Sequence, residues 1–230
     1  MPNIDTNEVE SAIQPAFCAT GGFFGRGLDG AERVAGFLLL AVSSPVIAAA
    51  AVALAAMSRR SPFVAHLRVG KNGKPLWVLK LRTMWETSRE RRDLDGLERR
   101  MVEPIVAETE GDPKDPSDGR VANRFAAFCR RHSIDEFPQL WHVVRGEMSL
   151  VGPRPLTRTE VRRHYGRHTD ELLAVKPGLT GLWQISGRSH IRFPERAAMD
   201  LQLVRNMAPS LYAKILLRTL PALIQGKGAW

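Results

Sequence analysis

Two adjacent carboxylates, Asp135 and Glu136, lie in the stretch of the chain that is richest in reactive side chains. Neighbouring carboxylates repel each other, so both stay ionised only where cations compensate them. Arg130 and Arg131 precede the pair and can supply part of that charge. A divalent cation such as Mg²⁺, which prefers carboxylate and phosphate oxygens, can supply more. The combination suits phosphoryl transfer, in which positioning and charge neutralisation do most of the catalysis.

The sequence around the pair predicts the start of a helix. Pro138 is tolerated only in the first turn of a helix, which favours Asp135 as the capping residue. Ser133 and Glu136 also have capping-box spacing, but that register puts Pro138 further inside the helix. Gly146 is expected to end the helix. Its expected apolar face consists of Leu140, Trp141, Val143 and Val144. From spacing alone, an ordinary capped helix explains these residues as well as a catalytic site does.

Residues 76–82 are expected to form a strand, which follows the strong turn signal Asn72-Gly73. Side chains alternate between the two faces of a strand, so Lys80 and Arg82 share one face. They form either a pair that faces phosphate or the solvated face of an edge strand.

Arg154 lies between Pro153 and Pro155. The two prolines restrict the backbone around it. A stiffly held guanidinium suits the bidentate recognition of phosphate, although prolines also flank arginines in plain turns.

The composition limits the class of protein. The chain has 230 residues, a charged fraction of 25% and an apolar fraction of 44%, which exclude a fully disordered or collagen-like chain. Its two cysteines exclude a disulfide framework. The formal net charge of +9 calls for a polyanionic neighbour: nucleic acid, an anionic membrane face or phosphorylated substrates.

Residues 34–58 carry no charged side chain and are long enough for a membrane helix. A buried core helix and a secretory signal are the alternatives. The run has no polar stripe, and it is too long and starts too late for a signal peptide. Arginines flank it on both sides, at Arg26 and Arg33 and at Arg59 and Arg60. The positive-inside rule would place both ends in the cytoplasm.

Pro45 falls near the middle of this run and follows Ser43 and Ser44. Its ring clashes with the carbonyl of Ala41 in a regular helix, and the serine hydroxyls can bond the freed backbone groups. Each arm would then span roughly 16–20 Å, about half a bilayer and its interface. We therefore expect a re-entrant helix hairpin kinked at Ser44-Pro45, with a kinked full span as the alternative.

The expected fold class is α/β: mostly helical, with a small β-hairpin or sheet, in a monotopic membrane protein. Residues 1–27 are expected to be disordered, 28–60 to form the re-entrant helix and 61–230 the catalytic domain. Two prolines and two glycines in residues 109–119 predict a flexible loop.

The order of these segments closely resembles the bacterial sugar transferases, the monotopic polyprenyl-phosphate phosphoglycosyl transferases, in their small single-domain form. The segments that carry the resemblance are Ser44-Pro45, Arg68-Val-Gly70, Lys80-Leu-Arg-Thr-Met84, Ser133-Ile-Asp-Glu-Phe-Pro-Gln-Leu-Trp141, Arg145-Gly-Glu-Met-Ser-Leu-Val-Gly-Pro-Arg-Pro155 and Lys176-Pro-Gly-Leu-Thr-Gly-Leu-Trp-Gln-Ile-Ser-Gly-Arg188. They cover roughly residues 28–220. Each is weak alone, but the block around Asp135 followed directly by the block ending at Pro155 is highly specific.

The resemblance implies a two-step reaction. Asp135 would attack the phosphate next to the sugar of a UDP-sugar, release UMP and carry the phosphosugar covalently. The phosphate of a polyprenol, such as undecaprenyl phosphate, would then take over the phosphosugar, which predicts ping-pong kinetics. This is the initiating step of exopolysaccharide or other glycoconjugate synthesis.

The resemblance also implies roles for individual residues. Glu136, together with Asp135, would hold Mg²⁺. The phosphates would be bound by Lys80, Arg82, Arg130 and Arg154. The segment 176–188, with Gln184 and Arg188, would help to form the nucleotide-sugar pocket. The catalytic domain would lie on the cytoplasmic face of the bacterial inner membrane, in contact with its lipid.

Some positions depart from the usual pattern of the family: Ser61, His66 and Ala213. They put substrate identity in doubt more than the reaction, and neither the sugar nor the oligomeric state can be read from the sequence. The alternative functions are an inactive membrane-bound partner of polysaccharide assembly and a tethered nucleic-acid binder. No recognition motif supports the second, so no nucleic-acid partner is expected.

Two further basic segments allow two interpretations each. Arginines at 158, 162, 163 and 167 form either a solvated helix face or a membrane-surface patch. Residues 210–220 predict an amphipathic helix that either packs on the core or contacts lipid at the interface.

Overall fold

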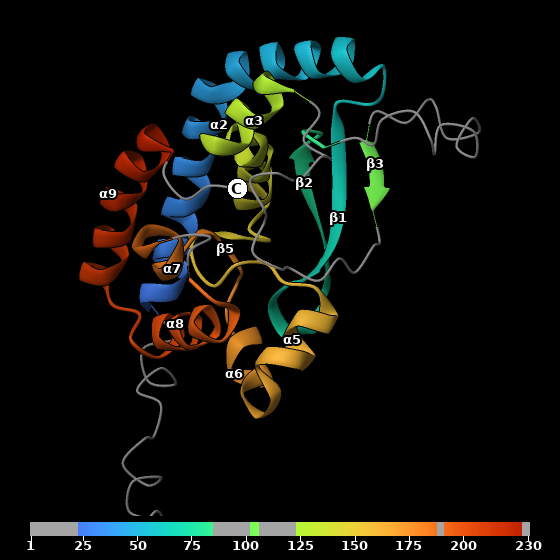
Figure 1. Ribbon diagram of the computed structural model, residues 1–230. Coiled ribbons are helices and arrows are strands. Elements are labelled where there is room, and N and C mark those ends of the chain that lie inside the picture. Colours follow the sequence, from blue (N-terminus) through green and yellow to red (C-terminus); the bar gives the residue numbers. More distant parts are fainter. Residues whose placement is uncertain (1–22, 85–101, 106–122, 188–190, 227–230) are drawn as a thin grey trace, which may run out of the picture.

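The computed structural model describes residues 23–84, 102–105, 123–187 and 191–226. Helices dominate these residues, and two small sheets lie among them, as Figure 1 shows. The expected mostly helical α/β architecture is confirmed. The expected loop at 109–119 and Arg188 lie outside the described residues.

Helix α2 (Phe23–Ser58) is one long helix with Pro45 in its interior. It bends sharply, so its second arm runs across the top of the molecule in Figure 1. Pro45 has no N–H for the carbonyl of Ala41, and the Ser44 hydroxyl donates to that carbonyl at 2.8 Å. The Ser43 hydroxyl donates to the carbonyl of Leu39 at 2.7 Å. The expected kink and its serine compensation are thus confirmed, whereas the membrane topology stays a prediction.

The start of α2 corrects one expectation. Residues 23–27 were expected in the disordered segment, but the helix already begins at Phe23. Contacts of the early turns with the rest of the domain explain the longer helix. Asp29 forms an ion pair with Lys176 at 2.9 Å, and the side chain of Glu32 is buried. The sequence gives no sign of these contacts, because their partners lie more than a hundred residues away.

Helix α2 has a packed face and a bare one. The second arm buries Ile47, Ala50 and Leu54 against the domain. On the opposite face Val42 is 80% exposed and Val52 is 71% exposed. By length and composition it is the one helix within the described ranges that could cross a membrane. A bare apolar face of this size marks a membrane or protein contact.

The first sheet is built on the predicted hairpin. Strands β1 (Phe63–Val69) and β2 (Pro75–Leu81) pair antiparallel, and Val69 lies opposite Pro75. The short helix η2 (Lys71–Gly73) makes the turn, with Asn72 at φ 57° as the Asn-Gly signal requires. Strand β3 (Val102–Ile105) pairs parallel with β1, so the order is β2-β1-β3. This hairpin places Lys80 near the end of β2.

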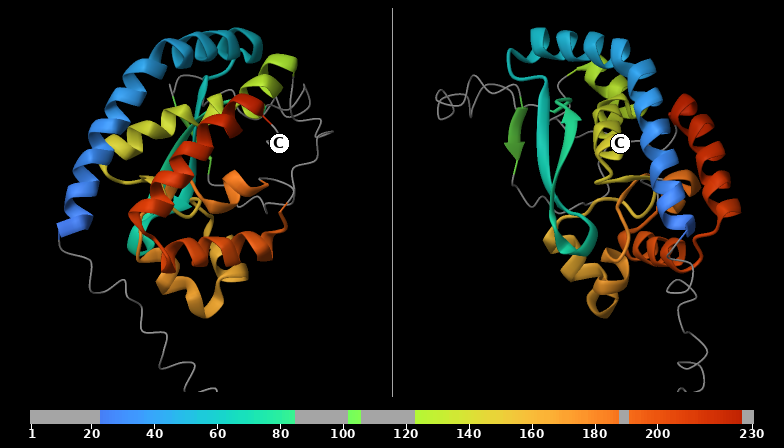
Figure 2. Two further views of the ribbon diagram at one scale, coloured as in Figure 1. Left: turned by 90° about the vertical axis from the view of Figure 1, so that its left-hand side faces the viewer. Right: turned by 180° about the vertical axis from the view of Figure 1, so that it is seen from behind.

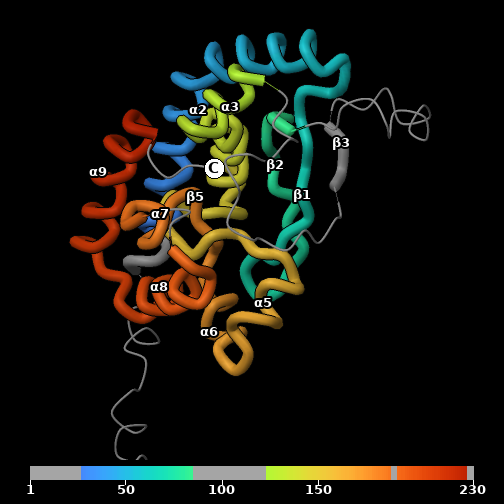
Figure 3. Tube along the Cα trace, viewed as in Figure 1, coloured from blue at the N-terminus to red at the C-terminus, as the bar shows by residue number. Residues whose placement is uncertain are grey.

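The second sheet consists of two short parallel strands, β4 (Ser149–Val151) and β5 (Gly178–Thr180). The two strands approach so closely that a Cβ atom on Gly178 would overlap the backbone of Gly152. Between the two sheets the chain forms α3 (Arg124–Arg131), the 3-10 helix η3 (Ile134–Gln139) and α4 (Leu140–Arg145). Figure 3 follows this path along the trace.

The remaining helices follow in the C-terminal part of the chain, and α9 packs against both strands of the second sheet. They are α5 (Arg158–His164), η4 (Gly166–His168), α6 (Thr169–Leu173), α7 (Leu182–Ser186), α8 (Phe193–Arg205) and α9 (Pro209–Gln225). Helix α5 lies at the opposite end of the molecule from the second arm of α2 (Figures 1 and 2). The arginines at 158, 162, 163 and 167 are exposed, and both interpretations of this basic segment stay predictions.

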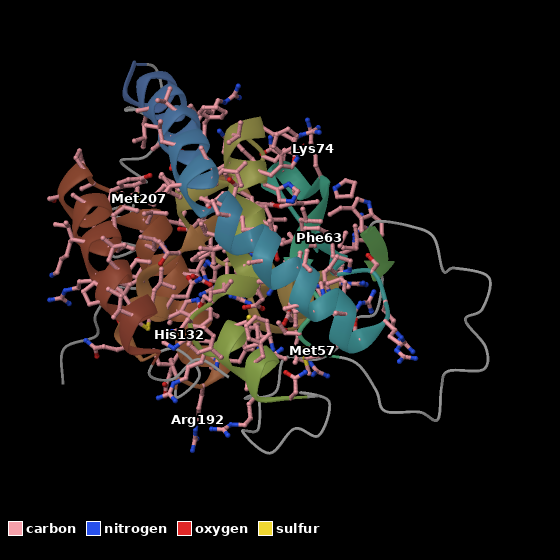
Figure 4. The ribbon with its side chains drawn as sticks, turned by 90° about the horizontal axis from the view of Figure 1, so that it is seen from above. Met57, Phe63, Lys74, His132, Arg192 and Met207 are labelled. Atoms are coloured by element: carbon pink, nitrogen blue, oxygen red, sulfur yellow. The ribbon has the colours of Figure 1, made fainter. Side chains whose placement is uncertain are left out.

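Helix α9 has one buried face and one exposed face, so it packs on the core, and contact of the exposed face with lipid stays a prediction. Ile215 is fully buried, whereas Leu217 is 71% exposed and Ile224 is 75% exposed. The imidazole Nδ1 of His132 lies 2.9 Å from the carbonyl of Leu223, which joins the end of α9 to the end of α3. Figure 4, seen from above, shows His132 between these two helices. The helix thus packs on the core and leaves an apolar stripe bare.

Candidate active site

The carboxylate pair sits on a tight turn between α3 and α4. Ser133 has φ 55° and reverses the chain after α3, and the N–H of Glu136 donates to the carbonyl of Ser133 at 3.0 Å. Asp135 then lies inside the 3-10 helix η3 and is 8% exposed. The expectation that Asp135 caps an α-helix is wrong. The chain keeps 3-10 geometry through Gln139, and the α-helix begins only at Leu140.

The apolar face of α4 is confirmed only in part. Leu140 and Val143 are buried, but Trp141 is 48% exposed. Gly146 ends the helix with φ 75°, as expected. The buried side of α4 packs under α2, where Val143 lies so close to Gly36 that a Cβ there would touch it. Helix α4, which follows the carboxylate pair, is therefore packed directly against α2.

Two cations from distant segments meet at Glu136. Lys80 Nζ lies 2.7 Å from Glu136 Oε1, and Arg154 donates to the same oxygen at 3.1 Å. Lys80 comes from β2 and Arg154 from the turn after β4. The negative charge of Glu136 raises the pKa of Arg154, and burial opposes this. The structure thus brings together three of the residues predicted from the sequence.

Asp135 lies among the same charges. Its carboxylate also contributes to the raised pKa of Arg154. Burial, and then the charge of Asp135, raise the pKa of the Cys129 thiol to about 11. Cys129 is a fully buried residue of α3, so it stays a neutral thiol at neutral pH. Asp135 is therefore a buried carboxylate whose charge acts on both the Cys129 thiol and the Arg154 guanidinium.

The other predicted phosphate ligands are placed differently. Arg82 lies just beyond the end of β2 and is 5% exposed, and its Nε donates to the carbonyl of Ser61 at 2.7 Å. One donor of its guanidinium is therefore engaged by the backbone of Ser61. Arg130 lies in the last turn of α3, which leads into the turn that carries Asp135. These positions leave the expected phosphate contacts of both arginines as predictions.

Gln184 lies on the short helix α7, next to Trp183. Its side-chain N–H donates to the carbonyl of Leu179 at 3.2 Å. The guanidinium of Arg154 lies 5.9 Å from the centre of the Trp183 ring, which places α7 beside the carboxylate site. The segment 176–188 is thus adjacent to Arg154, as far as it is described.

A second polar cluster behind Arg154 was not predicted. Arg196 lies 4.8 Å from the centre of the Trp183 ring, on the same indole as Arg154. Asp200 is 1% exposed and accepts from the Tyr165 hydroxyl at 2.9 Å. Burial raises the pKa of Asp200 to about 7. Burial and the charge of Arg154 lower the pKa of Arg196. The four-residue spacing of Arg196 and Asp200 on one helix face was the signal for this cluster.

The acidic pair is chemically suited to Mg²⁺. This ion is commonly held by one or two carboxylates together with substrate phosphates, and it keeps several waters. Asp135 and Glu136 supply two adjacent carboxylates. Residues 23–84, 102–105, 123–187 and 191–226 contain no group of three or more His, Cys, Asp or Glu side chains placed to hold a metal. A site that needs phosphate to complete it fits this donor set better than an all-protein cage.

Comparison with known proteins decides the family. The family model of the bacterial sugar transferases matches residues 26–226. The chain belongs to the bacterial sugar transferase family. The resemblance expected from the motifs is thereby confirmed.

Three relatives within the sugar transferases illustrate the range. The UDP-galactose-lipid carrier transferase of Erwinia amylovora is 40% identical over 171 residues, which is 74% of this chain and 35% of that protein. The exopolysaccharide production protein ExoY of Rhizobium meliloti is 38% identical over 172 residues, 74% of this chain and 73% of that protein. The UDP-glucose:undecaprenyl-phosphate glucose-1-phosphate transferase of Caulobacter vibrioides is 35% identical over 208 residues, 86% of this chain and 70% of that protein.

The first two curated relatives are much longer than their match to this sugar transferase. The matched region spans about a third of the Erwinia protein and of an uncharacterized sugar transferase of Haemophilus influenzae.

Proposed function

We propose that this sugar transferase moves a phosphosugar from a UDP-sugar to a polyprenyl phosphate such as undecaprenyl phosphate. The observation that carries the proposal is the contact of Lys80 and Arg154 with Glu136, directly beside the buried Asp135. Names of relatives support the same class of reaction, since one is an undecaprenyl-phosphate galactose phosphotransferase of Salmonella typhimurium. The products would be UMP and a polyprenyl diphosphate-linked sugar that starts an exopolysaccharide or another glycoconjugate.

In the first step a carboxylate oxygen of Asp135 attacks the phosphorus that is bonded to the sugar oxygen. The bond from this phosphorus to the oxygen bridging the two phosphates breaks, and UMP leaves with that oxygen. The phosphosugar is then an acyl phosphate on Asp135. The cations at positions 80 and 154 orient the diphosphate and stabilise the charge that builds up on its oxygens.

In the second step an oxygen of the polyprenyl phosphate attacks the phosphorus on Asp135. The carboxylate leaves unchanged, so the enzyme returns to its starting state. Splitting the transfer in this way gives ping-pong kinetics, because UMP leaves before the second substrate reacts. Asp135 and Glu136 would hold Mg²⁺, which would supply additional charge neutralisation at the phosphates.

A UMP-release assay tests the reaction. The purified chain in nanodiscs, given a panel of radiolabelled UDP-sugars, polyprenyl phosphate and Mg²⁺, should release UMP with at least one sugar. Asp135→Asn keeps the shape of the side chain but removes the nucleophile, and it should abolish release. Chelation of Mg²⁺ should do the same and be reversed by adding the ion back. Full activity of Asp135→Asn would contradict the nucleophile assignment. A well-folded wild-type chain that is inactive with every sugar would favour the inactive-partner alternative.

The proposed location is the cytoplasmic face of the bacterial inner membrane, with α2 as a re-entrant hairpin. The bend at Pro45 and the arginines beyond both ends of the uncharged run support this arrangement. There the long lipid substrate can present its phosphate at the membrane surface.

The topology can be tested in a Cys18→Ser background, where the remaining cysteine, Cys129, is buried. Single cysteines at Gly27→Cys and Ser61→Cys should both react only from the cytoplasmic side. Labelling from opposite sides would establish the kinked full span instead.

A further inference from the structure

Glu32 is a buried acid that the reaction above does not use. It lies on the first arm of α2, two residues before the uncharged run, and is 4% exposed. A carboxylate is rarely buried this deeply unless its oxygens are fully bonded. Its partners therefore indicate what it does.

Three donors from two other elements converge on one oxygen of Glu32. The Tyr212 hydroxyl of α9 donates to Oε1 at 2.6 Å, and the backbone N–H of Leu150 donates to it at 2.9 Å. The Ser149 hydroxyl donates to the same atom. Burial, and then the hydrogen bond to Glu32, raise the pKa of Tyr212, so its proton stays in place. The carboxylate thus joins α2, β4 and α9 at one point.

The bond to Leu150 matters most for the site, because it completes the pairing of β4. On the side that faces β5, the N–H of Ser149 donates to Pro177 and that of Gly152 to Thr180, both at 2.9 Å. The N–H of Leu150 points to the opposite edge, which no strand covers in the described ranges. Glu32 takes the place of the missing strand there.

Strand β4 leads directly to the catalytic arginine. It ends at Val151, and Gly152 and Pro153 follow before Arg154, whose guanidinium contacts Glu136 at 3.1 Å. The N–H of Gly178 donates to the carbonyl of Pro153 at 2.8 Å, which restrains the backbone of this turn. A shift of β4 is therefore passed on to Arg154 over only a few stiff residues.

We propose that Glu32 is a positioning residue that couples the position of α2 to the placement of Arg154. Its carboxylate fixes the position of β4 relative to the apolar run of α2. The depth of that run in the lipid then sets the distance of the Arg154 guanidinium from the membrane surface. The link to catalysis rests on the proposed function, whereas the link between Glu32 and β4 does not.

The test compares Glu32→Gln with Asp29→Asn in the full chain in nanodiscs. Asp29 is a matched control: it lies one turn earlier on the same arm and bonds Lys176, but it is 46% exposed in that pair. Exposed ion pairs contribute little, so the control should behave like the wild type. The Glu32 variant keeps the size of the side chain and loses its charge.

The first readout is hydrogen–deuterium exchange of the peptide that contains Leu150. Loss of a charge-assisted bond should speed exchange there by about tenfold or more in Glu32→Gln and leave it unchanged in Asp29→Asn. Ser149→Ala, which removes a single donor, should give an intermediate effect and guards against misfolding of the Glu32 variant. Unchanged exchange in both variants would overturn the proposal, whatever the chain catalyses.

The second readout is the rate of UMP release. Misplacement of Arg154 by a fraction of an ångström should lower kcat of Glu32→Gln by about tenfold, with KM for the UDP-sugar changed less than about twofold. In an Arg154→Lys background the same substitution should cost almost nothing more, since both act through one group. Additive losses in the double variant, or equal kcat for Glu32→Gln and the wild type, would overturn the coupling to catalysis. An inactive wild type would instead contradict the proposed function and leave the exchange result to decide the link to β4.

Discussion

Glu136 and Glu32 differ in the kind of partner that each one faces. Glu136, at the active site, faces two cations, Lys80 and Arg154. Glu32, where α2 meets β4, faces a phenol, an alcohol and a backbone N–H. Cations held by a carboxylate can be shared with an arriving phosphate, because the phosphate offers the same charge. Neutral donors aimed at one oxygen gain nothing from exchange. The first arrangement suits a site that must bind and release substrate, and the second suits a permanent joint.

Asp200, a further buried acid, extends the comparison. It accepts from a neutral donor, the Tyr165 hydroxyl, as Glu32 accepts from neutral donors, but burial raises its pKa to about 7. It lies behind Arg154, whose charge favours the ionised carboxylate. Burial of Asp200 thus favours its protonated form, and this can be measured.

The largest expected effect comes from a substitution of Glu136. Glu136→Gln removes the charge that Lys80 and Arg154 share, so both cations lose their counter-ion and their alignment. UMP release should fall by about a hundredfold or more, measured as initial rates at saturating substrate. Glu171→Gln is a suitable control, since it breaks the exposed pair with Arg205 and should keep the wild-type rate within about twofold. Equal rates for both variants would remove the functional distinction between the two kinds of acid.

A smaller effect is expected from Asp200→Asn, and it should appear in the pH dependence of stability. Between about pH 4 and pH 7 the folded chain keeps a proton on Asp200 that the unfolded chain has released. The free energy of unfolding contributed by this group therefore falls as pH rises through that window, by about 1.4 kcal/mol for each pH unit. Asn cannot titrate, so the variant should lack this part of the slope. The Tm of both proteins, measured in detergent from pH 4 to 8, checks this. Parallel curves would show that Asp200 is ionised like an ordinary aspartate.

The smallest expected effect concerns the hydrogen bonds that Glu32 accepts from α9 and β4. Tyr212→Phe removes one of its three donors and leaves the other two, so the free energy of unfolding should fall by about 1–2 kcal/mol. Lys214→Gln, at an exposed position of the same helix, should change it by less than about 0.5 kcal/mol. Chemical denaturation in detergent compares the two variants. A Tyr212→Phe variant as stable as the wild type would mean that its bond to Glu32 contributes nothing.

Local signals in the sequence predicted the local structure well. The Asn72-Gly73 turn gave the β1–β2 hairpin, and Pro45 with its two serines gave the bend in α2. The gathering of Lys80, Glu136 and Arg154 followed from the resemblance to the family together with the charge argument. Each of these features depends on neighbouring residues or on a pattern that the chain displays in order.

Features that depend on long-range contacts were missed or wrong. The left-handed turn at Ser133 placed Asp135 inside a 3-10 helix, and nothing in the local pattern indicated a serine in that conformation. Arg82 lies one residue beyond the end of its strand and donates from Nε to the carbonyl of Ser61, and its expected phosphate contact stays a prediction. Glu32 looked like an ordinary charged residue before a membrane helix, since its partners are over a hundred residues away.

The most direct test of the central claim is to trap the phosphosugar on the enzyme. The wild-type chain is mixed with a UDP-sugar and Mg²⁺ in the absence of polyprenyl phosphate, quenched in acid and examined by intact-mass and peptide mass spectrometry. The account predicts one added phosphosugar on the peptide that contains Asp135, formed together with one equivalent of UMP, lost on adding polyprenyl phosphate, and absent in Asp135→Asn. UMP release that requires polyprenyl phosphate and leaves no adduct on the chain would contradict it.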